Sequence, residues 1–267
     1  MIDLLQYIVF GIIQGLTEPL PVSSSGHLRI FSFYLGLDVP DLHLETFLNA
    51  ASLLAVFVVY RKDLLELGFG TMRYVRKREP DDKPMFRLSF LIVVGTIPAV
   101  VAGGLLYETI SLEFTHIYMV AGALLVTGAA LFIIRKLNGN KQEGDITFLD
   151  AVIVGLAQSL ALAPGISRSG ATVVAAMARK IEPAAALKYS FFLSIPASLG
   201  SLVITGNQII AALSSPDRIV LYTAAFIASF VISVFAIKLF IEVITSGKLI
   251  YFAGYCAGVA MLLFIFN

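Results

Sequence analysis

Long apolar stretches separated by short polar segments dominate the pattern along this 267-residue chain. A helix that crosses the hydrocarbon core of a bilayer, roughly 30 Å thick, needs about 17–25 mostly apolar residues. Six stretches approach or reach that length and are predicted to be transmembrane helices: residues 45–60, 88–107, 117–134, 189–205, 219–241 and 249–266. The pattern therefore predicts an all-α polytopic membrane protein that forms a single membrane domain over residues 1–267.

Two further apolar segments, within residues 4–36 and 148–179, are interrupted by proline, glycine and serine. In each segment, an apolar helix too short to span is followed by a polar loop and a second short helix. Irregular backbone at membrane depth is tolerated only where protein buries it or water reaches it. We therefore predict two re-entrant helical hairpins. The alternative is that each segment forms one kinked transmembrane helix.

The two interrupted segments are related by an internal repeat with a constant offset of 144 residues. Six of sixteen aligned positions are identical, with Gly11, Gln14, Leu16, Ser23, Ser25 and Gly26 matching Gly155, Gln158, Leu160, Ser167, Ser169 and Gly170. One hairpin plus three spans forms the repeat unit, which predicts unit 1 over about residues 1–140 and unit 2 over about residues 145–267. Because three spans are an odd number, unit 2 is predicted to be inverted, with the two hairpins opposed near the midplane.

Composition supports this assignment and excludes several classes of protein. Hydrophobic residues make up 58% of the chain and charged residues 14%, whereas soluble globular domains are about half apolar and about a quarter charged. The formal net charge of +1 gives no bulk positive field for binding nucleic acid. A single cysteine, Cys256, excludes an intramolecular disulfide and a thiolate metal cluster.

The distribution of basic residues predicts the orientation of the chain in the cell membrane. Residues 61–87 contain eight Lys and Arg, and the inverted arrangement places sixteen of the nineteen basic residues on one face. The positive-inside rule makes that face cytoplasmic. The first hairpin is then predicted to enter from the outer side of the membrane, and both chain termini are predicted to be external.

The first hairpin concentrates polar side chains within a short stretch. Gln14 and Glu18 are four residues apart and share one helix face, and an ionised carboxylate in the membrane is costly unless it meets a cation or a donor. The loop and the start of the second helix add Ser23, Ser24, Ser25, Gly26 and His27. Free amide groups at a helix start attract anions. The alternative interpretation is that the serines only cap the helix and that His27 makes one satisfied hydrogen bond.

The second hairpin carries an arginine in place of the acid. Leu162 stands where the first hairpin has Glu18, and Ala171 stands where it has His27. Beside Arg168, the polar or flexible residues of this hairpin are Ser167, Ser169, Gly170 and Thr172. A planar guanidinium donates bidentately to phosphoryl oxygens, so we predict a phosphate-binding site here. A purely structural ion pair between Arg168 and Glu18 is the alternative.

Together, these groups suit phosphoryl transfer, in which positioning and charge neutralisation dominate. Glu18 and Gln14 offer hard oxygen ligands for a divalent cation, either Mg²⁺ or Ca²⁺. Ser24 is a candidate attacking hydroxyl, and His27 is a candidate nucleophile or general acid–base. The sequence leaves the choice between these two residues open.

At these positions the sequence resembles the undecaprenyl-pyrophosphate phosphatase family, the BacA-type integral membrane enzymes linked to bacitracin resistance. The motifs that carry the resemblance are residues 14–18, 23–27 and 164–172, and it extends over essentially the whole chain. The resemblance implies six spans with two opposed re-entrant hairpins. It also implies hydrolysis of a membrane-embedded polyprenyl pyrophosphate to the monophosphate and inorganic phosphate, which recycles the lipid carrier of envelope glycan synthesis.

The resemblance further implies a role for individual residues, at a site that faces the outer side of the membrane. The implied catalytic residues are Glu18, Ser24, His27 and Arg168, and the implied pyrophosphate-binding residues are Ser23, Ser25, Gly26, Ser167, Ser169, Gly170 and Thr172. A divalent cation would be bound by Glu18 and Gln14. Gln14 departs from the more usual glutamate, which predicts weaker cation binding, and Pro19 stands where an aromatic residue is more common.

Other functions remain as alternatives. Inverted repeats with broken helices are also typical of transporters, so a transporter or flippase of a phosphorylated polyprenyl lipid is the main alternative to the enzyme. A passive anion channel would use Arg168 but leave Glu18 unexplained. Glu45 and Asn49, at the start of the first span, are predicted to face the hairpin and support the site, and a polar helix end at the membrane interface is the alternative. Small residues that permit close helix packing, within one chain or in a homodimer, are Gly122, Gly128, Gly254 and Gly258.

Overall fold

The computed structural model describes residues 2–36, 42–113, 116–163 and 165–266, and these residues form helices and connecting loops without a β-strand. The helices are α1 (Ile2–Thr17), α2 (Ser24–Leu35), α3 (Leu42–Val59), α4 (Arg61–Lys77), α5 (Lys83–Glu113), α6 (Ile117–Ile134), α7 (Phe148–Leu160), α8 (Arg168–Ala178), α9 (Pro183–Leu213), α10 (Pro216–Thr245) and α11 (Ile250–Phe266). Short 3-10 helices cover Pro80–Asp82 and Glu143–Asp145. The predicted loop residue Pro164 and the chain ends Met1 and Asn267 lie outside the described residues.

Long apolar helices make this a polytopic membrane protein, as predicted. Among the described residues, four helices are long and apolar enough to cross a membrane, and they correspond to α5, α6, α9 and α10. A fifth candidate is α3, which bends by 81° into the amphipathic helix α4, whereas α11 contains only 17 residues. The predicted count of six spans is therefore not settled by helix length and composition, and it stays a prediction.

The helix α9 extends well beyond the span predicted for it. The prediction placed a span at residues 189–205, but α9 covers 31 residues from Pro183 to Leu213. Lys188, just before the predicted span, pairs with Asp63 and Glu143 and lies inside the helix. An ion pair removes much of the cost of a charge near the membrane, so the helix continues past it.

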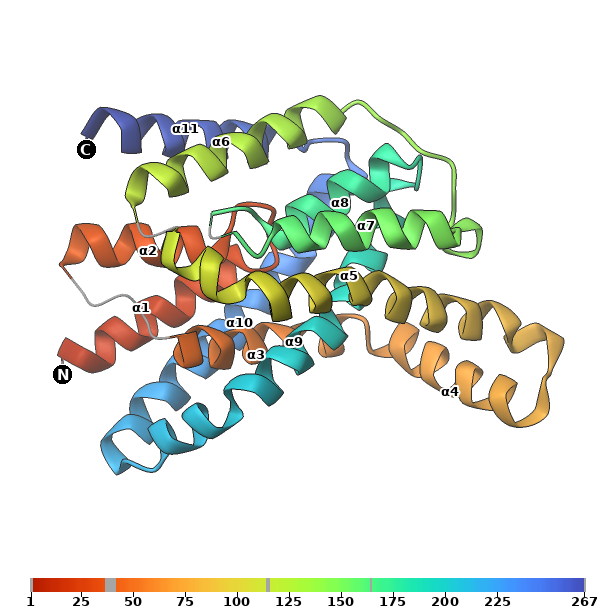
Figure 1. The fold of residues 1–267 in the computed structure, drawn as a ribbon, viewed down its shortest axis with the longest axis horizontal. Coiled ribbons are helices and arrows are strands. Elements are labelled where there is room, and N and C mark those ends of the chain that lie inside the picture. Colours follow the sequence, from red (N-terminus) through yellow and green to blue (C-terminus); the bar gives the residue numbers. More distant parts are fainter. Residues whose placement is uncertain (1, 37–41, 114–115, 164, 267) are drawn as a thin grey trace.

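Each interrupted segment forms a helical hairpin rather than one kinked helix. In Figure 1, α2 returns alongside α1 towards the end at which α1 begins, and α8 returns alongside α7 in the same way. The loops of the two hairpins meet inside the bundle. The Ser169 hydroxyl donates to the Leu20 carbonyl oxygen at 3.0 Å, and the Ser167 hydroxyl lies 3.5 Å from the same oxygen. The predicted convergence of the two loops is confirmed.

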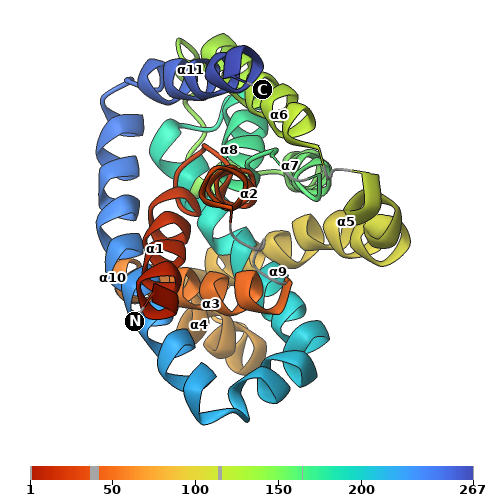
Figure 2. The same ribbon diagram turned by 90° about the vertical axis from the view of Figure 1, so that its left-hand side faces the viewer.

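The surrounding helices are arranged so that the two halves of the chain correspond. Figure 2 shows α5 and α10 on opposite sides of the hairpins, with the α6–α11 pair above them and the α3–α9 pair below. The hairpin helix α1 packs on α10, and α7 packs on α5. A Cβ atom added at Gly11 would lie 2.2 Å from the Ala225 carbonyl oxygen, and one at Gly155 would lie 2.2 Å from that of Gly95. Equivalent repeat positions thus make equivalent close backbone contacts.

Only one of the four glycines proposed for helix packing makes a close contact in the described part of the chain. A Cβ added at Gly128 would lie 3.1 Å from the Ala253 carbonyl oxygen, so this glycine serves the contact between α6 and α11. Around the other three, Gly122, Gly254 and Gly258, no described atom apart from the nearby backbone of their own helix lies within 4 Å of that position. The homodimer stays a prediction.

Ion pairs connect basic residues from separate loops to a buried acid at one end of the bundle. Asp150, whose side chain is fully buried at the start of α7, pairs with Lys141 at 2.9 Å and with Arg179 at 2.7 Å. Burial alone would raise the pKa of the Asp150 carboxyl. Hydrogen bonds from Lys141, Thr147 and Arg179 outweigh that effect and hold the pKa well below its usual range. This network joins the start of α7 to the end of α8.

Candidate active site

Equivalent serines cap the second helix of each hairpin. The Ser23 hydroxyl accepts from the Gly26 amide at 3.3 Å, and the Ser167 hydroxyl accepts from the Gly170 amide at 3.1 Å. These bonds satisfy one of the free amides that every helix start leaves unpaired. Ser23 and Ser167 therefore cap these helices, and their role in binding substrate stays a prediction. The two helix starts come together because the loops that precede them are in contact.

Glu18 is the centre of the polar cluster between the two hairpins. Its Oε1 atom accepts from the Arg168 guanidinium, and the two side chains form an ion pair. Its Oε2 atom accepts from the Ser24 hydroxyl and, at 3.3 Å, from the Gln14 amide nitrogen. Both oxygens of the carboxylate are thus supplied with donors, which offsets the cost of holding a negative charge away from bulk water.

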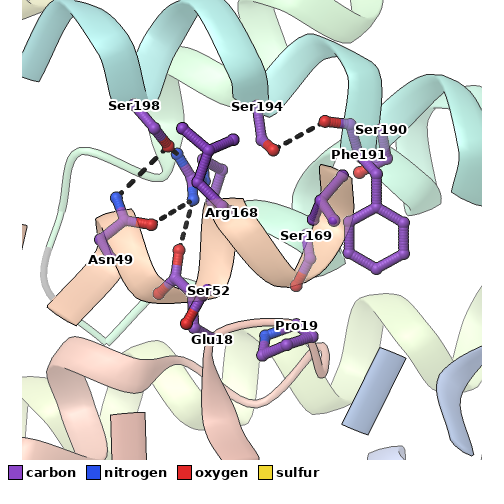
Figure 3. A pocket seen from close by; sticks show the side chains of 12 residues that line it. Glu18, Pro19, Asn49, Ser52, Arg168, Ser169, Ser190, Phe191, Ser194 and Ser198 are labelled. Carbon is purple, nitrogen blue, oxygen red and sulfur yellow. Dashed lines mark hydrogen bonds and ion pairs between the residues drawn. The ribbon is translucent and has the colours of Figure 1, made fainter. Parts of the chain in front are cut away.

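Arg168 is also held by residues from the two helices α3 and α9. Its Nη1 atom donates to the Ser198 hydroxyl at 3.2 Å, and its Nη2 atom lies 3.4 Å from the Asn49 amide oxygen (Figure 3). The prediction that Asn49 faces the hairpin is confirmed. Ser198 was missed, although it belongs to a row with Ser190 and Ser194, spaced four residues apart along α9. That spacing was the available signal.

Two cavities meet at this cluster. The larger has a volume of about 200 Å³ and is lined by Gln14, Glu18, Ser23, Ser24, Ser25, Glu45, Thr46, Asn49, Ala161, Leu162, Ile166, Ser167, Arg168 and Ser201. The smaller, shown in Figure 3, has a volume of about 20 Å³, which is enough for about one water molecule. Glu18, Asn49 and Arg168 line both cavities, so the ion pair forms part of the wall between them.

The remaining predicted binding residues divide into three groups. Ser23, Ser25 and Ser167 line the larger cavity together with the predicted catalytic residue Ser24, and Ser169 lines the smaller one. Thr172 makes internal hydrogen bonds, to the Ser190 hydroxyl at 2.5 Å and to the Arg168 carbonyl oxygen at 2.9 Å, and is not among the described residues that line either cavity. Gly26 and Gly170 contribute their backbone to the helix starts, where the capping serines already accept from their amides.

His27 points away from this cluster. Its ring nitrogens lie 2.7 Å from the Ser23 carbonyl oxygen and 2.8 Å from the Tyr255 hydroxyl of α11. The residue is 4% exposed and is not among the described residues that line the two cavities. Sequence reasoning missed Tyr255 because a tyrosine within an apolar helix gives no signal of its own. The catalytic role of His27 stays a prediction.

Comparison with known proteins accounts for these motifs. The family described as "Bacitracin resistance protein BacA" matches residues 7–262. The chain belongs to the BacA family. It is 48% identical over 253 residues to undecaprenyl-diphosphatase 1 of Halalkalibacterium halodurans, covering 95% of this chain and 92% of that protein. It is 43% identical over 263 residues to undecaprenyl-diphosphatase 2 of Bacillus thuringiensis, covering 98% of this chain and 97% of the relative.

The BacA-family site offers few direct ligands for a divalent cation. Glu18 and Glu45 are the carboxylates that line the larger cavity, and the described residues contain no cluster of three or more His, Cys, Asp or Glu able to hold a metal ion. Gln14 Oε1 is buried and has no hydrogen-bond partner among the described residues. One carboxylate and one free amide oxygen fit Mg²⁺ or Ca²⁺ where water and substrate phosphates supply the other ligands.

Proposed function

We propose that this chain hydrolyses a membrane-embedded polyprenyl pyrophosphate of the undecaprenyl type to the monophosphate and inorganic phosphate, and so recycles the lipid carrier of cell-envelope glycan synthesis. Membership of the BacA family and the printed names of its relatives support this function. The proposal depends on one observation: Glu18, Ser24 and Arg168, from two hairpins that are distant in the sequence, meet at the wall of one cavity.

The cavity suits the head group of such a lipid. Arg168 supplies a planar donor for phosphoryl oxygens, and the starts of α2 and α8 supply backbone amides with the favourable end of the helix dipole. Ser25 and Ser167 add hydroxyl donors on the same lining. A volume of about 200 Å³ accommodates a polar head group rather than a long isoprenyl chain, so the chain would lie between the helices and lipid.

Ser24 is the nucleophile in the proposed mechanism. Its hydroxyl already donates to Glu18, the arrangement that a nucleophile and its general base require. The Ser24 oxygen attacks the terminal phosphorus, its proton passes to Glu18, and the bond to the bridging oxygen breaks to release the polyprenyl monophosphate. The proton on Glu18 passes to the leaving monophosphate, which frees the carboxylate. Glu18 then takes a proton from the water that attacks the phosphoserine and returns it to the Ser24 oxygen, which releases inorganic phosphate and restores the hydroxyl.

Arg168 has two partners in this mechanism. Without substrate it neutralises Glu18, and with substrate its remaining donors hold the phosphoryl oxygens on which negative charge develops. A cation held by Glu18 and Gln14 would add charge neutralisation of the substrate phosphates. The ion pair and the phosphate-binding role of Arg168 are therefore successive states of one site rather than exclusive alternatives.

The proposed membrane arrangement has six spans, formed by α3, α5, α6, α9, α10 and α11, with both hairpins re-entrant and the two repeat units inverted. Support comes from the basic end of the bundle, where Lys188 and Asp150 pair with residues of three connections. That end faces the cytoplasm by the positive-inside rule, so the larger cavity and both termini face outwards. After replacement of Cys256, a cysteine at Ser214 should react with an impermeant reagent in intact cells, and one at Gly144 should not.

Transport alone is the weaker candidate. A binding site is enough for a translocator, whereas the donors gathered on one carboxylate are those of a general base. In the described conformation, the cavity on the other side of the Glu18–Arg168 pair has room for about one water molecule. A space of that size is too small for a lipid head group to pass through.

Phosphate release by purified protein tests the proposed function. Full-length protein in detergent or nanodiscs is incubated with a farnesyl or longer isoprenyl pyrophosphate, and both inorganic phosphate and lipid monophosphate are measured. The proposal predicts equal amounts of the two products. Binding of the lipid without release of either product, together with its movement between leaflets of a vesicle, would favour the transporter instead.

A further inference from the structure

A hydrogen-bonded chain connects α11 to the serine loop of the first hairpin. The Tyr255 hydroxyl lies 2.8 Å from His27 Nε2, and the two rings stack with centroids 5.5 Å apart and planes inclined by 10°. The other ring nitrogen, Nδ1, lies 2.7 Å from the Ser23 carbonyl oxygen. Because a carbonyl oxygen only accepts, Nδ1 carries the proton, and Nε2 of the neutral ring accepts from the Tyr255 hydroxyl.

The carbonyl group held by His27 belongs to a strained residue. Ser23 has φ 68° and ψ 102°, on the positive-φ side that residues with a Cβ atom rarely adopt. Such conformations persist only where the surroundings hold them, and they concentrate at functional sites. The side chain and the backbone amide of His27 both donate to the Ser23 carbonyl oxygen, at 2.7 and 3.2 Å. Two bonds from one residue thus hold this peptide group.

The second hairpin provides an internal comparison. Ser167 caps α8 just as Ser23 caps α2, but its φ is −74°, an ordinary value for a residue before a helix. Ala171 stands at the position of His27, and its backbone amide alone reaches the Ser167 carbonyl oxygen, at 2.8 Å. In the described residues, the first hairpin therefore has both the strained capping serine and the imidazole contact, and the second hairpin has neither.

Ser24 is bonded directly to this strained residue and donates its hydroxyl hydrogen to Glu18. A rotation of the Ser23 peptide would turn Ser24 away from the carboxylate, since the two serines are adjacent. We propose that Tyr255 is a positioning residue for the hydrolysis: through His27 it holds the Ser23 peptide and so keeps Ser24 directed at Glu18. This inference rests on the proposed function and gives His27 a positioning role as well.

Kinetics of Tyr255→Phe test the inference, with Tyr251→Phe as the matched control. Tyr251 lies one turn earlier on α11 and is 64% exposed, against 47% for Tyr255. Loss of this partly buried hydrogen bond predicts that Tyr255→Phe lowers kcat roughly five- to tenfold with KM unchanged, whereas Tyr251→Phe retains wild-type values. In a His27→Asn background, Tyr255→Phe should add no further loss, because the two residues act in one chain.

The ¹⁵N resonance of His27 Nε2 gives a readout that does not depend on turnover. The chain has three histidines, and the His27 signals are identified by their loss in His27→Asn. In Tyr255→Phe the Nε2 resonance should move to the position of an unprotonated ring nitrogen without a donor, while Nδ1 keeps its proton. Tyr251→Phe should leave both resonances in place.

Equal kcat values for Tyr255→Phe and Tyr251→Phe would overturn the inference and leave the proposed function intact. So would an equal loss from Tyr255→Phe in the wild-type and His27→Asn backgrounds. If the wild-type protein releases no phosphate, the proposed function fails. The hydrogen-bonded chain is then still tested by the Nε2 resonance, and an unchanged resonance in Tyr255→Phe would overturn it.

Discussion

Glu18 and Arg168 are separated by 150 positions in the sequence and form an ion pair between the loops of the two hairpins. Ser24, which is the repeat equivalent of Arg168, donates to the other oxygen of the same carboxylate. Two equivalent positions of an internal repeat therefore donate to one carboxylate. After duplication, one copy supplies a hydroxyl and the other supplies a positive charge.

Replacement of Arg168 by lysine should lower phosphate release by about two orders of magnitude. A compact ammonium group cannot hold Glu18, Asn49 and a phosphoryl group with separate donors, as the guanidinium does. The rate is measured at saturating lipid pyrophosphate. Arg218→Lys, at an exposed position of α10, is the control and should keep the wild-type rate. Equal rates for both variants would remove Arg168 from the reaction.

Ser24→Ala should reduce turnover by about two or more orders of magnitude, because the variant lacks the attacking oxygen. Ser25→Ala, which removes one hydroxyl from the same cavity lining, should cause a much smaller loss, of about tenfold or less. A phosphorylated serine should be detectable by mass spectrometry in wild-type protein quenched with acid during turnover. If Ser24→Ala keeps wild-type turnover, water rather than this hydroxyl attacks the phosphorus.

Removal of divalent cations with EDTA should suppress phosphate release, and Mg²⁺ or Ca²⁺ should restore it. Gln14→Glu would add a second carboxylate beside Glu18, and a higher ligand charge strengthens binding of hard cations. The cation concentration that gives half-maximal activity should therefore fall about tenfold in this variant. The titration is run at fixed substrate concentration. Full activity in EDTA-treated protein would show that the reaction needs no divalent cation.

Asp150→Asn should destabilise the protein by about 2–4 kcal/mol, because it leaves the two cations at the start of α7 without their buried counter-ion. The pKa of the Asp150 carboxyl is lower in the folded protein than in the unfolded chain. Its stabilising contribution is therefore complete above the ordinary carboxyl pKa and is lost as the pH falls below about 4. Thermal unfolding of wild type and variant should differ at pH 7 and converge at low pH.

The sequence predicted the parts of the fold and site that depend on pattern. The hairpins could be predicted because rare polar residues recur at a constant offset of 144 residues. The contact between Glu18 and Arg168 was expected because the two hairpins were predicted to converge. The length of α9 could not be predicted, because the ion pairs of Lys188 form between distant segments. Ser198 and Tyr255 were missed for a similar reason, since each reaches the site from a separate apolar helix.

The direction of the His27 side chain is a second limit of sequence reasoning. Its position in the motif placed it within the site, but the rotamer turns the ring towards α11 rather than into the larger cavity. Neighbouring positions on a helix start point in different directions, and the packing of a helix from the end of the chain decides which contacts form. The sequence of the hairpin alone does not contain that information.

In the proposed mechanism, the carboxylate shared by Ser24 and Arg168 is the base of a lipid pyrophosphate hydrolase. The most direct test compares inorganic phosphate release by purified wild-type protein and Glu18→Gln, which keeps the size of the side chain but removes its charge. We predict release of equal amounts of phosphate and lipid monophosphate by the wild type, and a rate about two or more orders of magnitude lower for the variant. A correctly folded Glu18→Gln protein with the wild-type rate would show that Glu18 is not the base.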